Sequence, residues 1–263
     1  MRQATLVTAY GPKPAHLSAL LLECQRMLTE ALGDSFQPYE LSQIHATIIG
    51  LEHLLESPNC NLNLWRFRSR LGHMDLPGFV ASVLTHPCFP MSVQFGGFAD
   101  RDYPFTSRGQ RPFDRSFSIQ GTKAVLIGWP VRGKPAVSAT RQSQYSAAQE
   151  SRLYPTSLDD VRRFALNFNI LHEYHSDITD TDNDCYLRLG LCNGTSDLEA
   201  GQIVQAKIRR YLGQTDPVFV EISKADLNIV SYTDGSLPCG STRSWPIVDK
   251  ASTSDLTGRL YRD

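Results

Sequence analysis

One histidine and one threonine stand two residues apart in the apolar stretch Gln43–Glu52. In a β-strand that spacing places His45 and Thr47 on the same face. An imidazole can accept or donate a proton near neutral pH, so the pair is a candidate for acid–base chemistry. The opposite face would carry Ile44, Ala46, Ile48 and Gly50. We expect a cavity in front of the polar pair; the alternative is a structural histidine beside an ordinary strand threonine.

The chain has 263 residues, 41% hydrophobic and 20% charged, which is ordinary for a globular protein. It contains no apolar run of about 18 residues and no signal-like start, so a cytoplasmic protein without a membrane partner is expected. The six cysteines are dispersed without a Cys-x-x-Cys pair, which predicts neither a zinc site nor a disulfide framework.

Charge is distributed unevenly along the chain despite a formal net charge of -1. The segment Arg101–Arg141 holds eight Lys or Arg against two Asp, whereas Glu173–Glu199 holds seven acidic residues against one Arg. A basic segment of this kind suits partners that carry phosphate.

Strand and helix patterns alternate through the first 98 residues. A helix over Ala15–Leu32, ended by Gly33, follows from leucines at helical spacing. A second helix is expected over Asn61–Leu71, with Leu64, Trp65 and Leu71 facing inward. Strands are expected over Ala4–Tyr10, through His45, over Phe79–Leu84 and over Met91–Phe98.

The second half repeats this order after a loop over Ala99–Ser116. Helices are expected over Ser157–His172 and over Ser196–Leu212, the latter opened by a capping box and ended by Gly213. Arg132–Pro155 is expected to be a mobile connection, and the tail 239–263 has no predicted place. Strands are expected over Phe117–Gln120, Lys123–Val131, Cys185–Leu191, Val218–Ile222 and Leu227–Thr233.

Three identities recur at one offset of 141 residues: Leu71-Gly72 matches Leu212-Gly213, and Asp75 matches Asp216. The same offset carries His45 onto Tyr186 and Thr47 onto Arg188. Matching identities flanked by matching elements indicate an internal duplication. The two polar pairs would then face each other across a pseudo-twofold axis.

With these motifs, the sequence resembles the two-histidine phosphoesterase superfamily, which includes 2′-5′ RNA ligase-like proteins and cyclic phosphodiesterases. His45-Ala46-Thr47-Ile48 matches the family's His-x-Thr/Ser-hydrophobic motif, and the likeness covers roughly residues 4–235. The resemblance implies a general base and a general acid acting on a phosphodiester, hydroxyls that hold phosphate oxygens, and no metal or cofactor. The second motif departs from the pattern, because Tyr186 and Arg188 replace the second histidine and the second hydroxyl.

A phenol can donate a proton but is a poor base at neutral pH, whereas arginine grips phosphate bidentately. The sequence therefore predicts His45, Thr47 and Tyr186 as catalytic residues and Arg188 as a phosphate holder. Arg115 is the expected substrate contact among the arginines interleaved with aromatics in residues 101–115. These arginines could equally be a solvated loop, and Tyr186 and Arg188 could be ordinary residues on the solvent face of a strand.

Two further groups of side chains could do chemistry. His172 and His175 could replace the missing histidine, although stabilising a helix C-terminus is the reading we favour. Four aspartates, Asp177, Asp180, Asp182 and Asp184, resemble a calcium loop, but the required Gly and closing Glu are absent, so no metal is expected.

Together these observations predict an α+β, bilobal fold of two pseudo-twofold-related β-α-β-α-β-β lobes with a central groove. The N-terminal lobe would span 1–98, the C-terminal lobe 99–238 and a tail 239–263. We expect a monomeric, metal-independent phosphodiesterase acting on RNA ends, 2′,3′-cyclic phosphates or small nucleotides. The alternatives are a catalytically weakened nucleotide- or RNA-binding module on the same scaffold and a purely structural interaction protein that makes no use of His45.

Overall fold

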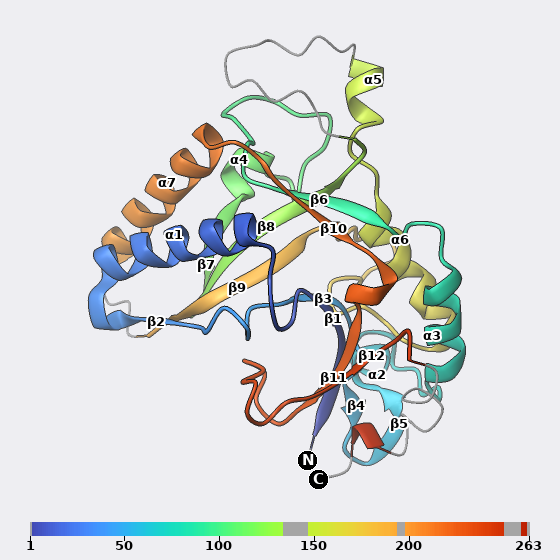
Figure 1. Cartoon of the computed structure of the whole chain (residues 1–263). Coiled ribbons are helices and arrows are strands. Elements are labelled where there is room, and N and C mark those ends of the chain that lie inside the picture. Colours follow the sequence, from blue (N-terminus) through green and yellow to red (C-terminus); the bar gives the residue numbers. More distant parts are fainter. Residues whose placement is uncertain (1, 134–146, 194–197, 250–258, 262–263) are drawn as a thin grey trace.

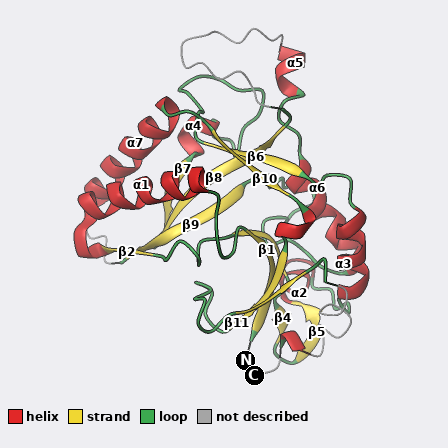
Figure 2. Ribbon diagram, in the orientation of Figure 1, coloured by secondary structure: helices red, strands yellow, loops and turns green. Residues whose placement is uncertain are grey.

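The fold is a mixed α+β structure in which two antiparallel sheets diverge from a shared core (Figures 1 and 2). The computed structural model describes residues 2–133, 147–193, 198–249 and 259–261. The mixed α+β class predicted from the sequence is therefore confirmed.

The smaller sheet, sheet A, has the strand order β12-β11-β1-β3. Strand β1 is buried on both faces, with Ala4 and Leu6 in the main core and Val7 in a smaller cluster, whereas the outer strand β12 is mostly exposed. The sheet joins distant parts of the chain, because Gln3 pairs with Tyr232 and Thr5 with both Val230 and Gly50. Its strands are β1 (Gln3–Thr8), β3 (Ala46–Gly50), β11 (Asn228–Tyr232) and β12 (Arg243–Pro246).

The larger sheet, sheet B, has the order β10-β6-β8-β9-β2, with β7 also paired to β8. Helices α1 (Ala15–Leu32) and α7 (Leu198–Gln214) lie side by side over one of its faces (Figure 1). The buried leucines of α1 recur at helical spacing, which is why this helix forms and packs there. The strands are β2 (Phe36–Pro38), β6 (Met91–Phe95), β7 (Phe117–Gln120), β8 (Lys123–Val131), β9 (Cys185–Cys192) and β10 (Val218–Ile222).

Shorter elements surround the two sheets. A small sheet pairs β4 (His53–Leu54) with β5 (Ser57–Asn61). Three 3-10 turns cover Gly33–Ser35, Ala165–Phe168 and Lys224–Asp226. The remaining helices are α2 (Leu62–Arg68), α3 (Leu76–Thr85), α4 (Pro112–Arg115), α5 (Ala147–Ser151) and α6 (Ser157–Phe164).

A buried arginine on α6 ties sheet A to the segment that precedes β9. The guanidinium of Arg162, 1% exposed, donates to the backbone carbonyls of Thr47 and Ile48 at 2.9 Å each. It also donates to the carbonyls of Asp182 and Asp184 and to the Asp182 carboxylate, at 2.9, 3.1 and 3.2 Å. Arg162 therefore fixes strand β3 relative to the start of strand β9.

Several element predictions were wrong. Phe79–Leu84 lies inside helix α3 rather than in a strand, because Asp75 accepts from the Gly78 amide and caps a helix that continues through the apolar run. The second helix ends at Arg68, and the expected inward residues Trp65 and Leu71 are 48% and 61% exposed.

Other element boundaries also differ. The helix predicted over Ser157–His172 gives way to a 3-10 turn after Phe164, and Asn169 in the left-handed region ends it. Gly213 lies within α7 rather than at its end. Part of the predicted capping box at Ser196 and the centre of the Arg132–Pro155 connection lie outside the described residues.

The chain does not divide into the predicted lobes 1–98 and 99–238. Sheet A takes β1 and β3 from the first range, β11 from the second and β12 from the predicted tail. Sheet B likewise takes β2 and β6 from the first range and its other strands from the second. Each sheet is thus assembled from both halves of the chain, so the boundary at residue 98 separates strands that belong together.

The repeated identities fall on different kinds of element. Leu71 and Gly72 lie between α2 and α3, whereas Leu212 and Gly213 lie inside α7. The offset nevertheless relates β3 to β9, and these two strands lie close together where the sheets meet.

Among the described helices, none is long and apolar enough to cross a membrane.

Candidate functional site

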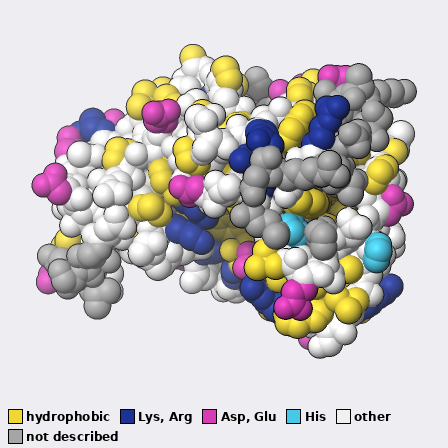
Figure 3. All heavy atoms as spheres, turned by 90° about the horizontal axis from the view of Figure 1, so that it is seen from below, with side chains coloured by type: hydrophobic (Ala, Val, Ile, Leu, Met, Phe, Trp, Pro, Cys, Tyr) yellow, Lys and Arg dark blue, Asp and Glu magenta, His cyan; other side chains and the backbone are white. Residues whose placement is uncertain are grey.

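A pocket of about 640 Å³ opens between sheet A and sheet B. Four of the five predicted site residues line it: His45 and Thr47 from the β3 side, Tyr186 and Arg188 from β9. Seen from below, Lys and Arg side chains gather beside the depression between the two parts of the molecule, with a few acidic side chains (Figure 3). Two polar pairs 141 residues apart in sequence thus share one cavity, as the offset predicted.

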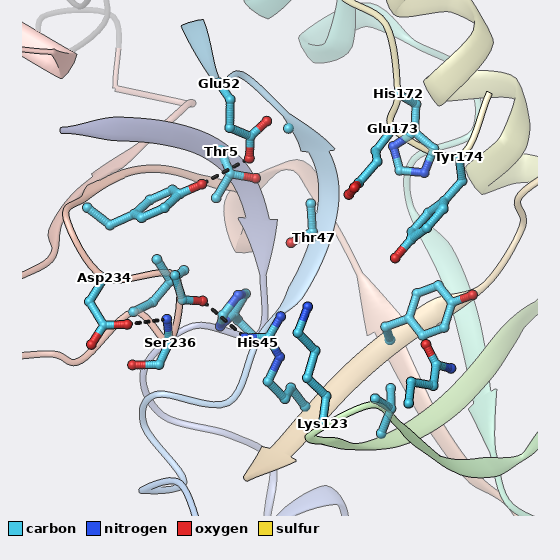
Figure 4. Close-up of a pocket in the computed structure, with 18 of the residues that line it drawn as sticks. Thr5, His45, Thr47, Glu52, Lys123, His172, Glu173, Tyr174, Asp234 and Ser236 are labelled. Atoms are coloured by element: carbon cyan, nitrogen blue, oxygen red, sulfur yellow. Dashed lines mark hydrogen bonds between the residues drawn. The ribbon is translucent and has the colours of Figure 1, made fainter. Parts of the chain in front are cut away.

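The imidazole of His45 is held in one tautomer at the pocket wall (Figure 4). Its Nδ1 lies 2.9 Å from the Gln43 carbonyl oxygen, which can only accept, so Nδ1 carries the proton and Nε2 keeps a free lone pair. Burial lowers the pKa of His45 to about 4, and the charges of Arg188 and Lys13 act in the same direction. His45 is therefore neutral at pH 7 and able to accept a proton.

A β-bulge in β3 changes which residues face the pocket. The pairing with β1 shifts register between Leu6 and Val7, so the regular alternation of β3 is interrupted and Gly50 faces the pocket together with Thr47. The expectation that Gly50 shares the core face with Ile48 was wrong for this reason. The Thr5 hydroxyl donates to the Ile49 carbonyl at 3.0 Å and stabilises the irregular backbone.

The bulge also brings a carboxyl group into the pocket. Glu52 follows β3, and its carboxylate folds back over Gly50, where an added Cβ would lie 2.1 Å from Oε2. Tyr232 on β11 donates its hydroxyl to Glu52 Oε1 at 2.9 Å (Figure 4). Burial raises the pKa of Glu52. Gly50 is thus required because the space above it is filled by a side chain of the site.

Two cations on sheet B face the pocket beside His45. Arg188 donates to the Gly235 carbonyl at 3.3 Å, and among the described residues no carboxylate forms an ion pair with it. Lys123 on β8 lines the same wall, and its pKa is lowered, first by the charge of Arg188 and then by burial. Two cations that repel each other favour an anion bound between them.

We expect Arg188→Met to raise the pKa of His45 above about 4, because it removes a neighbouring positive charge. The pKa should remain below that of free histidine, since burial, the larger cause, is unchanged. A proton NMR titration of the His45 ring measures this. Arg111→Met, which removes a cation paired with Asp100 and Asp114, is the matched control and should not move it. An unchanged His45 pKa in Arg188→Met would contradict the assignment.

The phenol hydroxyl of Tyr186 takes part in a buried hydrogen-bond network. It donates to Asp184 Oδ2 at 2.7 Å and accepts from Arg115 at 2.8 Å. Asp184, 2% exposed, also accepts from Ser107 and from the Trp129 indole, and burial together with Asp184 raises the pKa of Tyr186. The Tyr186 proton is therefore not free for a leaving group, so this geometry does not support its predicted role as proton donor.

Arg115 lies behind the pocket rather than in it. Its guanidinium is buried, bonded to Tyr186 and 3.5 Å from Asp184, and it is not among the residues that line the cavity. Its predicted role as a substrate contact is replaced by that of positioning Tyr186.

A second imidazole lines the pocket: His172, 4% exposed, on the wall opposite His45 (Figure 4). His172 Nε2 lies 2.7 Å from Asp182 Oδ2, so Nε2 carries the proton and Nδ1 keeps a lone pair. That Nδ1 is buried and has no hydrogen-bond partner among the described residues. Burial, then Arg162, lower the pKa of His172 to about 4, against the opposing effect of Asp182.

The nearby His175 lies outside the pocket. The His175 ring is 2.9 Å from Asp159 Oδ1 and does not line the pocket. The helix-terminus reading favoured for both histidines was wrong, since neither lies on a helix.

The carboxylates of residues 177–184 accept hydrogen bonds from neighbouring protein groups. Asp180 accepts from Ser176, Asp182 from His172 and Arg162, and Asp184 from Ser107 and Trp129. In the described ranges, no three His, Cys, Asp or Glu side chains converge as metal ligands.

Sequence reasoning missed Lys123, Glu52 and Tyr232 as pocket residues. The position of Lys123 could have been predicted, because it is the first residue of a strand that pairs with the strand carrying Tyr186 and Arg188. The position of Glu52 could not have been predicted, because the β-bulge in β3 determines that its side chain points into the pocket.

Comparison with models of known protein families, with curated proteins and with solved structures gave no match.

Proposed function

We propose that the protein is a metal-independent phosphodiesterase of the two-histidine phosphoesterase type, acting on RNA ends, 2′,3′-cyclic phosphates or small nucleotides. The observation that carries this proposal is one pocket holding His45, with a free Nε2, together with Thr47 and the cations Arg188 and Lys123. That set provides a base, a hydroxyl and positive charge for a phosphodiester and its pentavalent transition state.

In this proposal His45 accepts the proton of the attacking water or hydroxyl at Nε2. Arg188, Lys123 and the Thr47 hydroxyl bind the non-bridging phosphate oxygens. His172 takes the place predicted for Tyr186: it first takes up a proton at Nδ1, opposite the Nε2–H that Asp182 holds, and then donates that proton to the leaving oxygen. Burial lowers the pKa of both imidazoles to about 4, so the two roles rest on geometry: the Gln43 carbonyl holds the Nδ1–H of His45, whereas the Asp182 carboxylate stabilises the charge that His172 gains at Nδ1.

The bilobal fold of that superfamily is part of the same proposal. Two sheets flanking one pocket support it, as do β3 and β9 at the junction, related by the 141-residue offset. Any pseudo-twofold relation would join sheets A and B rather than the ranges 1–98 and 99–238.

The test is hydrolysis of 2′,3′-cyclic nucleotides and of 2′-5′- and 3′-5′-linked oligonucleotides with EDTA present. We expect turnover by the wild type and a loss of about 10²–10⁴-fold in His45→Ala, the range for a general base. His16→Ala is the matched control, because His16 lies outside the pocket and contacts the Phe219 carbonyl. Equal turnover in wild type and His45→Ala would refute the catalytic role.

The second candidate is a nucleotide- or RNA-binding module without turnover. The hydrogen bond from the Tyr186 hydroxyl to Asp184 favours this binding module, because a hydroxyl held in that way cannot serve as the second proton donor. Salt-sensitive binding without hydrolysis, weakened in Arg188→Ala, would support this version, since phosphate contacts dominate such affinity.

A further inference from the structure

A second hollow of about 590 Å³ adjoins the central pocket. Its walls include Phe67 from α2, Arg108, and Thr179 and Asp180 from the loop before β9. Glu173 and Tyr174 line both cavities and form the ridge between them. We call this second cavity the outer hollow. A ligand seated in the central pocket can extend over the ridge into it.

Arg108 is held at this ridge by a tight turn. Ser107 and Gln110 exchange two backbone hydrogen bonds of 2.9 Å, and the central residues Arg108 and Gly109 have φ of +49° and +73°. Positive φ is unfavourable for arginine, and such outliers concentrate where function requires them. The Ser107 hydroxyl is anchored 2.7–2.8 Å from the buried Asp184 carboxylate, which fixes the turn.

The side chain of Arg108 is oriented by aromatic rings rather than by hydrogen bonds. Its guanidinium carbon lies 4.0 Å from the centroid of the Tyr174 ring and 6.0 Å from that of Tyr186. Within the described part of the chain, no carboxylate or carbonyl accepts a hydrogen bond from Arg108, which is exposed. A planar cation is thus stacked at the ridge with its donors open to a ligand.

The charged side chains of the outer hollow determine whether it can bind an anion or an uncharged group. Glu173 and Asp180 line it beside Arg108, so a second phosphate there would meet two carboxylates without the cations Arg188 and Lys123 that line the central pocket. The aromatic rings of Phe67 and Tyr174 and the exposed hydroxyl of Thr181 suit a nucleobase and its sugar. The lining therefore fits an uncharged nucleoside better than an anion.

We propose that the outer hollow binds the second nucleoside of a dinucleotide or longer strand, with Arg108 donating to acceptor atoms of its base. This inference rests on the proposed function, because the phosphodiester that joins the two nucleosides lies in the central pocket. The preferred substrate is then an oligonucleotide end rather than a mononucleotide.

Calorimetric titration with two probes tests this. One is ApA with the 2′-hydroxyl at the linkage methylated, which blocks intramolecular attack, and the other is 2′-O-methyladenosine 3′-methyl phosphate, which has the same block and the same charge but lacks the second nucleoside. We expect the wild type to bind ApA about tenfold more tightly, within the range that stacking of one base contributes. Arg108→Ala should lose this gain while keeping its affinity for the methyl ester, and Arg111→Ala should bind both probes as the wild type does.

The gain from the second nucleoside should persist as salt is raised, because no phosphate enters the outer hollow. Equal affinities for the two probes in the wild type, or a gain that survives in Arg108→Ala, would overturn the inference and leave the proposed function standing. A gain that salt abolishes would show that the gain is electrostatic and does not come from stacking of the second nucleoside, which would also overturn the inference. If neither probe binds, both the inference and the proposed function fall.

Discussion

Replacing His172 by glutamine is expected to lower kcat on a 2′,3′-cyclic nucleotide by about 10²–10⁴-fold, the usual contribution of a general acid or base. The reason is geometric: Nε2 is oriented by Asp182, and Nδ1 lies buried at the pocket with no hydrogen-bond partner in the part of the chain that the structure describes. Glutamine keeps much of the volume and can still donate to Asp182, so the fold should survive. Steady-state kinetics, with circular dichroism to verify folding, measure the effect.

Tyr186→Phe is the matched control for this prediction. It removes a hydroxyl that donates to Asp184 and accepts from Arg115, both of which are buried. We expect a loss of stability of about 1–3 kcal/mol from the unpaired buried groups, with kcat changed little. The reverse order, with Tyr186→Phe inactive and His172→Gln active, would restore Tyr186 as the second catalytic group.

Arg162→Met is expected to lower the free energy of unfolding by about 3–5 kcal/mol, the cost of removing one partner of a buried ion pair. Methionine can fill part of the volume, but four backbone carbonyls would lose a donor and the Asp182 carboxylate would lose its positive partner. Urea denaturation at neutral pH measures the change. Because the charge of Arg162 lowers the pKa of His172, that pKa should also rise in the variant.

The adjacent Arg163 provides the control for Arg162. Its side chain is 37% exposed, and it pairs at 2.6 Å with the buried carboxylate of Asp159, whose other oxygen faces His175 and the Asp182 amide. Arg163→Met should cost less than Arg162→Met, because the Arg163 side chain reaches solvent and Asp159 keeps His175 and the Asp182 amide as partners. Similar losses in the two variants would show that the buried contacts of Arg162 do not hold the sheets together.

Helices and strands with a sustained pattern were predicted well from the sequence. The helix Ala15–Leu32 and the strand Lys123–Val131 have the predicted bounds, because the first repeats leucine over several turns and the second is a long buried apolar run. The short apolar run Phe79–Leu84 suits either a strand or a helix. The cap at Asp75 and the proline after Leu76 were the signals that decide for a helix.

The candidate site was predicted in part. His45, Thr47, Tyr186 and Arg188 share a pocket because each pair occupies one face of a strand, and that is a property the sequence pattern encodes. The roles of Tyr186 and Arg115 depend on Asp184, a partner distant in sequence from Arg115. The place of His172 similarly depends on a loop carboxylate and on where a helix ends, which local pattern does not determine.

Sheet A has a consequence for the order in which the molecule can be built. Its inner strand β1 pairs on one side with β3 and on the other with β11. The pairing of Gln3 with Tyr232 can therefore form only after β11 has been synthesised. During synthesis, β1 and β3 leave the ribosome long before β11 exists, and β1 carries an unpaired edge throughout that time. Tyr232, whose hydroxyl holds Glu52 in the pocket, belongs to β11 and is therefore also synthesised late. The site is therefore completed among the last events of folding, and a nascent chain stalled before β11 would expose an aggregation-prone edge instead of a working pocket.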